Sequence, residues 1–365
     1  MLKDFFTRAQ SRDDMLAVLG AALKQHDETT ARDKLIQLLQ SHGQDPEIVQ
    51  PVNIALSHMT GWNDPYQVLV TTKKMLEHVT DSRALATLAD RYALYAARQL
   101  EASDPLYALS TYGQIFEHSP GETDHQLSCL EGILRITETP HPADIEPMAR
   151  HLVTLADAAD NHDPAQLRLH NRVMDMTVHV DDPVLAMELY LAIYGNSDKE
   201  SALERDSFQE LISLSLAPAE KDRAVMIEGL YHAHDIAADN PTQQRQVEER
   251  LLALADASCE RDPLTAYAAY HFLLDEMPLQ DERAAPLMTK LLHLSSTLAT
   301  RDPDNVLSGL QLLMRRTAPG HYIFSQAHTL HDRMQARLTP ANYTDLKPLP
   351  PKNFALLHGS GMTPV

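Results

Sequence analysis

The sequence has little glycine and few aromatic residues. Only 12 of its 365 residues are Gly, and Phe, Trp and Tyr together make up 5%. Ala, Leu, Gln, Glu and Met, which favour helices, are abundant, whereas the β-branched and aromatic residues that favour strands are scarce. No segment shows the alternating pattern of a strand. The composition therefore predicts an all-α protein.

Long apolar runs and cysteine pairs are also missing. No apolar run approaches the length of about 18 residues that spans a bilayer, and the first residues turn polar too early for a signal peptide. Cys129 and Cys259 lie 130 residues apart in apolar, helix-like surroundings, which is typical of reduced core residues. We expect a soluble, cytoplasmic protein without a membrane partner.

Positive charge is scarce as well. The chain has 31 Lys and Arg against 51 Asp and Glu, a net charge of −20, and its densest basic cluster is Arg315-Arg316. Such a surface repels nucleic-acid phosphates and anionic lipids. We expect no nucleic-acid partner. The acidity serves solubility, or it attracts a basic partner.

What the sequence does contain is a repeated Asp-Pro dipeptide. Its aspartates are Asp45, Asp64, Asp104, Asp163, Asp182, Asp262 and Asp302, and Asn240-Pro241 is a variant. The successive intervals are 19, 40, 59, 19, 58, 22 and 40 residues, all close to a multiple of twenty. Asp is a preferred helix N-cap, and Pro suits the first helical position. Each dipeptide therefore predicts that one helix ends and the next begins.

Between these dipeptides the apolar residues follow helical spacing. One stripe consists of Leu85, Leu88, Tyr92, Tyr95 and Ala96, and a second consists of Val247, Leu251, Leu254, Ala255 and Ser258. The charged residues Glu248, Glu249 and Arg250 fall off the second stripe, so we expect them on a solvated face. The pattern predicts about fourteen to sixteen helices with short connections, and hence antiparallel neighbours.

A second pattern recurs after Asp-Pro, in the segments 105–120, 183–194 and 263–278. Ala108 is followed by Tyr112, Ile115, Phe116 and Pro120; Ala186 by Tyr190, Ile193 and Tyr194; and Ala266 by Tyr270, Leu273, Leu274 and Pro278. A weaker copy has Val306, Leu310, Leu313 and Met314. These copies are 78, 80 and 40 residues apart, so the repeating unit is a pair of helices of about forty residues.

This order of residues resembles the second helix of a tetratricopeptide repeat. The resemblance implies an α-solenoid, in which the small Ala lets two helices approach and the Tyr fills the gap to the next repeat. Two features depart from the family. The spacing exceeds thirty-four residues, and Ala93 and Ala97 stand where polar residues would clamp a peptide carboxylate. HEAT-type repeats and an irregular helical bundle remain as alternatives.

We therefore expect a helical repeat domain over residues 1–340, with N-terminal capping helices in 1–44 and an extended or disordered tail over 341–365. The tail contains Leu349-Pro350-Pro351, which is compatible with an SH3-like groove, and Thr363-Pro364-Val365, which loosely resembles a PDZ ligand. Packing of Phe354, Leu356 and Leu357 back along the solenoid is favoured over both.

Nineteen histidines suggest two metal hypotheses. His234-Asp235 resembles the centre of HD-domain phosphohydrolases, in which a metal activates water. However, Ala237 and Ala238 replace the glycine and lysine that usually follow, and His232 points to another face. His328 and His331, with His321 nearby, have a spacing that suits zinc. Surface or capping histidines are the default expectation for both sets.

No phosphate loop, nucleophile elbow or Cys-x-x-Cys motif is present, so we expect no catalytic, cofactor or metal residues. The favoured function is a non-enzymatic scaffold that binds a protein or peptide on a groove such as the face carrying Arg91, Tyr95 and Arg98. The net charge of −20 favours a basic partner. A metal-dependent phosphohydrolase centred on His234 and Asp235 is the alternative. A helical domain that binds a small ligand is the third.

Overall fold

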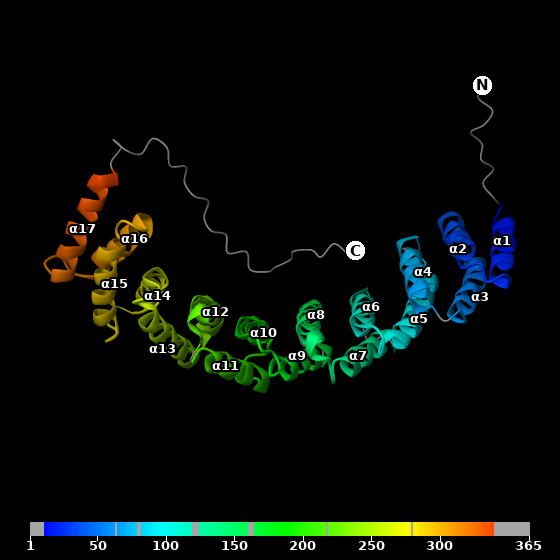
Figure 1. Cartoon of the computed structure of the whole chain (residues 1–365), viewed down its shortest axis with the longest axis horizontal. Coiled ribbons are helices and arrows are strands. Elements are labelled where there is room, and N and C mark those ends of the chain that lie inside the picture. Colours follow the sequence, from blue (N-terminus) through cyan, green and yellow to red (C-terminus); the bar gives the residue numbers. More distant parts are fainter. Residues whose placement is uncertain are drawn as a thin grey trace, which may run out of the picture. The chain divides into compact units, whose positions relative to one another are not determined.

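The computed structural model describes residues 11–62, 64–78, 82–118, 124–159, 164–216, 218–278 and 280–338. These residues form seventeen α-helices and four short 3-10 helices, and none of them forms a strand. The contacts divide the chain into two compact units, Met1–Pro218 and Ala219–Val365 (Figure 1). The tail at 341–365, with Phe354, Leu356 and Leu357, lies outside the described residues.

The first unit contains eleven of the described α-helices. They are α1 (Arg12–Lys24), α2 (Glu28–His42), α3 (Val49–Thr60), α4 (Pro65–His78), α5 (Arg83–Leu100), α6 (Pro105–His118), α7 (Asp124–Ile136), α8 (Ile145–Ala158), α9 (Pro164–Thr177), α10 (Pro183–Asn196) and α11 (Ala202–Leu214). The 3-10 helices η1 (Pro46–Ile48) and η2 (Pro142–Asp144) lead directly into α3 and α8. The predicted capping segment, 1–44, thus contains α1 and α2 in its described part.

The second unit contains six of the described α-helices. They are α12 (Arg223–Ile236), α13 (Pro241–Ser258), α14 (Pro263–Glu276), α15 (Ala284–Leu298), α16 (Pro303–Arg316) and α17 (Tyr322–Leu338), with η3 (Glu220–Asp222) and η4 (Ala237–Asp239) on either side of α12. None of the described helices combines the length and the apolarity needed to cross a bilayer.

Packing within each unit is local along the chain. Among the described helices of the first unit, substantial contacts join only helices one or two apart, such as α4 with α5 and α6 with α8. The second unit follows the same rule, as α14 packs on both α15 and α16. Even-numbered helices form one row and odd-numbered helices a second row in each unit (Figure 1). This nearest-neighbour packing of helical hairpins defines an α-solenoid.

The Asp-Pro dipeptides cap the helices as predicted. The carboxylates of Asp64, Asp104 and Asp182 accept hydrogen bonds from the backbone N–H groups of Gln67, Tyr107 and Val184 at 3.2, 3.2 and 3.0 Å. Equivalent bonds are made at Asp45, Asn240, Asp262 and Asp302. Asp163 lies outside the described residues. The recurrent interval of about twenty residues is therefore the length of one helix with its connection.

Hydrogen bonds within each row confirm the forty-residue unit. Side chains of one helix bond residues 37 to 39 positions away, two helices further along: Gln40 with His78, Tyr66 with Asp104, Arg91 with Asn53, Arg150 with Glu188, Asn196 with Asp157, and Ser308 with His271. A repeat of one helix pair brings equivalent positions side by side, which is why the same separation returns.

The Ala–Tyr pattern marks the core between the helices. Ala108, Tyr112, Ala186, Tyr190 and Tyr270 are all buried. Tyr112 packs so closely on α7 that a Cβ added at Gly132 would lie 2.7 Å from its ring. The small residues therefore set how near the helices approach, and the tyrosines fill the space between them.

The caps provide a direct test of helix initiation. Asp182→Ala removes the carboxylate that caps α10, and we expect it to lower the free energy of unfolding by about 1 kcal/mol. Asp181→Ala, at the exposed neighbouring position, is the matched control and should change it by less than about 0.5 kcal/mol. Urea unfolding followed by circular dichroism measures both, and equal effects would contradict the capping role.

Candidate functional site

The side chains of the predicted pair, His234 and Asp235, point to different sides of the helix that carries them. His234, near the end of α12, is 2% exposed, whereas Asp235 is exposed to solvent. The default expectation of a surface histidine is therefore wrong for His234. Successive residues of a helix point about 100° apart, so the two side chains face different surroundings. The structure does not bring His234 and Asp235 together.

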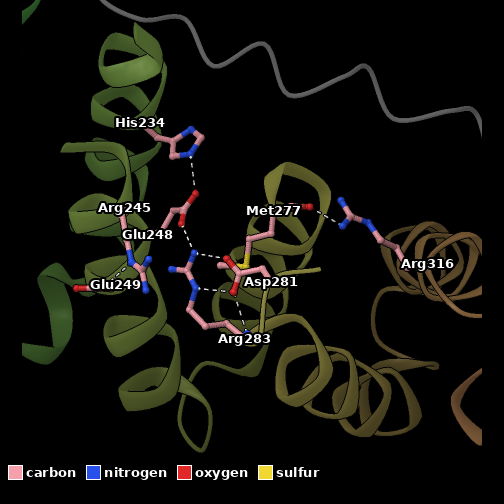
Figure 2. Close-up of polar contacts among 8 residues, drawn as sticks. All are labelled: His234, Arg245, Glu248, Glu249, Met277, Asp281, Arg283 and Arg316. Carbon is pink, nitrogen blue, oxygen red and sulfur yellow. Dashed lines mark hydrogen bonds and ion pairs between the residues drawn. The ribbon is translucent and has the colours of Figure 1, made fainter. Parts of the chain in front are cut away.

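His234 instead belongs to a mostly buried ionic cluster in the second unit, which we call the His234–Asp281 cluster (His234, Glu248, Asp281 and Arg283; Figure 2). His234 Nε2 lies 3.6 Å from Oε1 of Glu248 on α13. Arg283 Nη2, just before α15, lies 2.7 Å from the other oxygen of Glu248 and 2.6 Å from Oδ2 of Asp281. The cluster thus links α12 and α13 to the α14–α15 connection.

Glu248 corrects a second expectation, since the sequence placed it on a solvated face. Burial disfavours its charge, but the neighbouring His234 and Arg283 outweigh that effect, and the net result is a lowered pKa of the Glu248 carboxyl. Glu249, one position on, is exposed as expected and pairs with Arg245 (Figure 2). Glu248 can be buried only because Arg283, thirty-five residues away, reaches it.

Asp281 is bonded directly to Arg283, two positions further along the chain. It accepts hydrogen bonds from the guanidinium and the backbone N–H of Arg283, at 2.6 to 3.0 Å. These bonds lower its pKa from 3.8 to about 2. The carboxylate therefore stays charged throughout the range in which proteins normally fold, and it fixes the conformation of the turn before α15.

The histidines of α17 do not assemble as the zinc hypothesis requires. His328 and His331 have their Nδ1 atoms 3.0 and 3.7 Å from opposite oxygens of Asp332, a carboxylate that the hypothesis left out. His321 lies before the helix, where its ring accepts a hydrogen bond from Ile323 N–H. Among the described residues, no three His, Cys, Asp or Glu side chains are grouped so that they can hold a metal.

The candidate groove face on α5 is exposed in part. Arg91, Tyr95 and Arg98 are all exposed, whereas Ala93 and Ala97 are buried, so Tyr95 does not join the apolar stripe in which the sequence placed it. Arg91 donates a hydrogen bond to Asn53 Oδ1 at 2.7 Å and lies over the ring of Tyr92. Tyr95 is 49% exposed and is therefore accessible to a partner.

A further exposed surface, which sequence reasoning missed, joins α4 to α6. The rings of Tyr66 and Tyr107 meet edge to face with their centroids 5.4 Å apart, and the Tyr66 hydroxyl donates to Oδ2 of Asp104 at 2.8 Å. We call these three residues, with Asp64, the tyrosine–aspartate surface. The signal in the sequence is a tyrosine in the first turn after two successive Asp-Pro dipeptides.

The cysteines and the hollow beside α15 are two other candidate sites, and their contacts indicate structural roles. Cys129 is buried, which raises its thiol pKa to about 12, and neither Cys129 nor Cys259 forms a disulfide. A hollow of about 290 Å³ lies between α15 and the turn before α17. Arg316 at its edge donates to the carbonyls of Met277 and Asp275, at 2.5 and 2.7 Å, so this side chain holds the end of α14 (Figure 2).

No protein-family model matches the chain, and no curated protein matches its sequence. The chain is similar in fold to a solved structure described as a circular tandem repeat protein with novel repeat topology and enhanced subunit contact surfaces. The two are 12% identical, with a TM-score of 0.36 over 89% of this chain and 88% of the other. The packing of helices within each unit of the present chain identifies it as a helical repeat protein.

The His234–Asp281 cluster predicts a large effect for one arginine. Arg283→Ala leaves Glu248 buried without its cation, and we expect a loss of about 3 kcal/mol in the free energy of unfolding. Arg245→Ala is the matched control, because its pair with Glu249 is 62% and 57% exposed and should contribute less than about 0.5 kcal/mol. Denaturant unfolding of both variants distinguishes the two pairs.

Asp281 predicts how stability depends on pH. Its pKa is lowered on folding, so the stabilisation is complete above pH 3.8 and is lost as the pH falls towards 2. The stability difference between the wild type and Asp281→Asn should therefore be constant above about pH 5 and shrink below about pH 4. Unfolding curves at pH 3 to 7 measure it. A difference that does not change over this range would contradict the role of the charge.

Proposed function

We propose that this chain is a non-enzymatic scaffold that binds a protein or peptide on the exposed surface of its tetratricopeptide-like repeats. One observation carries the proposal. Of the thirteen large apolar side chains that are exposed in the described residues, six lie between positions 54 and 107: Ile54, Tyr66, Val70, Leu76, Tyr95 and Tyr107. The stretch from α3 to α6 thus carries nearly half of them, and exposed apolar side chains that form a patch are typical of an interaction surface.

The tyrosines strengthen this proposal. Five tyrosines of the described residues are buried in the helix packing, but Tyr66, Tyr95 and Tyr107 are 40%, 49% and 40% exposed on three consecutive helices. Tyrosine is enriched at the centres of protein interfaces, because it offers a large contact area with little conformational entropy to lose. Solenoids also present long surfaces that their own packing does not use.

The charge of the chain favours a basic partner. A net charge of −20 raises the local concentration of cationic segments and speeds their association. Within the region from α3 to α6, the α5 face carries Arg91 and Arg98, whereas the tyrosine–aspartate surface carries Asp64 and Asp104. The tyrosine–aspartate surface therefore suits a basic partner better than the α5 face does.

No contact described above favours the phosphohydrolase hypothesis, which stays a prediction with its own test. Stoichiometric Mn, Fe or Zn in the purified protein, together with hydrolysis of phosphomonoesters or nucleotides, would support the enzyme and contradict the scaffold. We expect neither result.

The scaffold is tested by locating a partner on the chain. Full-length protein is incubated in host lysate at physiological salt, crosslinked, and the crosslinked positions are mapped by mass spectrometry. We expect crosslinks within residues 54–107, and we expect the triple change Tyr66→Ala, Tyr95→Ala and Tyr107→Ala to abolish them. Tyr322→Ala, which removes an exposed tyrosine of the second unit, is the control and should leave them unchanged. Crosslinks that survive the triple change would contradict the proposal.

A further inference from the structure

The tyrosine–aspartate surface has the geometry of a site for a cation. Tyr66 and Tyr107 meet at 69°, so the two rings form an open corner with part of each ring accessible to solvent. The faces of aromatic rings carry negative electrostatic potential and attract cations placed over them. The corner comes from two different helices of one row, α4 and α6, and the Tyr66–Asp104 hydrogen bond joins them.

Carboxylates adjoin this corner. Asp104 Oδ2 accepts the Tyr66 hydroxyl, and Oδ1 accepts the N–H of Tyr107, so one carboxylate contacts both tyrosines. Each oxygen has a second lone pair and can accept another hydrogen bond. The hydrogen bond to Asp104, followed by burial and the charges of Asp104 and Asp64, raises the pKa of Tyr66. The carboxylates therefore place negative charge beside the Tyr66 hydroxyl.

One cation that contacts α4 next to Tyr66 is already engaged. Arg32, on α2, donates to the side chain of Gln67 at 2.8 Å and lies 3.7 Å from the carboxylate of Asp33. Its contact with α4 is thus made through Gln67, the residue after Tyr66, and its positive charge is offset by Asp33. The corner thus combines two exposed rings with carboxylates.

We propose that the tyrosine–aspartate surface binds an arginine side chain from a basic segment of a partner protein. This inference rests on the proposed scaffold function and gives it a partner chemistry. A guanidinium can stack on one ring and donate to Asp104 in the plane of the carboxylate at the same time. Arginine suits the corner better than lysine, because its planar, weakly hydrated group stacks and bonds simultaneously.

The second unit offers a comparison within the same chain. Its Asp-Pro helices α14 and α16 begin with Leu264-Thr265 and Asp304-Asn305 after the proline, where α4 and α6 have Tyr66 and Tyr107. Asp262 and Asp302 cap these helices in the same way. The caps are therefore common to both units, and the aromatic corner distinguishes α4 and α6.

The test uses full-length protein and two labelled peptides, hexa-arginine and hexa-lysine, titrated at about 0.15 M salt with fluorescence anisotropy. General attraction to the acidic chain acts on both peptides, whereas the corner favours arginine. We expect tighter binding of hexa-arginine. Tyr66→Ala combined with Tyr107→Ala should weaken that binding about tenfold and bring it close to that of hexa-lysine.

Three further variants separate the site from the fold. Tyr66→Phe keeps the ring and should retain binding, and Asp104→Asn keeps a good N-cap but loses the charge, so it should weaken binding about threefold to tenfold. Tyr322→Ala, which removes an exposed tyrosine of the second unit, should bind as the wild type does. Circular dichroism confirms that each variant is folded.

The outcomes distinguish this inference from the scaffold function. If hexa-arginine fails to bind, or binds equally well after the double tyrosine change, the arginine site is wrong, while crosslinks to residues 54–107 would still support a scaffold. If hexa-arginine binds at the corner but no partner is crosslinked there from lysate, the site stands and the scaffold function fails. Equal affinity for the two peptides would also overturn the preference for arginine.

Discussion

This array depends on how its helices begin. A carboxylate or amide side chain accepts N–H groups of the first helical turn, and proline follows it directly in the chain. The capping side chain satisfies an amide that would otherwise lack a partner, and proline fixes the backbone angle of the first helical residue. Because proline also disfavours helix in the residue before it, the preceding helix must end. At Asp104 and Asp262 one side chain therefore sets the boundary between two helices.

Regular boundaries allow equivalent positions of successive repeats to meet. Two acid–tyrosine–cation groups show the consequence. Tyr112 of α6 and Arg135 of α7 both bond Glu101, which follows α5, while Tyr270 of α14 and Lys290 of α15 both bond Asp256 of α13. In each case a tyrosine of the core pattern reaches a carboxylate in or directly after the preceding helix, and the following helix adds the cation. The same arrangement serves both units.

Much of the fold could be predicted from the sequence because its signals are local. The Asp-Pro caps and the Ala–Tyr spacing each lie within one helix, and the structure confirms the helices they predicted. The His234–Asp281 cluster could not be predicted in this way, because Glu248 and Arg283 are brought together by packing and no local pattern marks Glu248 as buried. Helical spacing even argued against it. The Tyr66–Asp104 bond was missed for a similar reason, since it joins positions 38 residues apart.

The site that sequence reasoning named is thus replaced by two others. His234 stabilises the second unit through Glu248, and Asp235 faces solvent. The functional proposal moves to the region from α3 to α6, where the packing leaves apolar side chains exposed.

Each unit is held together by contacts between neighbouring helices only, so a local change has local effects. Hydrogen–deuterium exchange of full-length Asp182→Ala, compared with the wild type under native conditions, tests it most directly. We predict faster exchange in α10 and in the helices packed on it, α8, α9 and α11, with no change in α1 to α5. Faster exchange throughout the first unit would contradict the account, because it would show one global core in place of a repeat array.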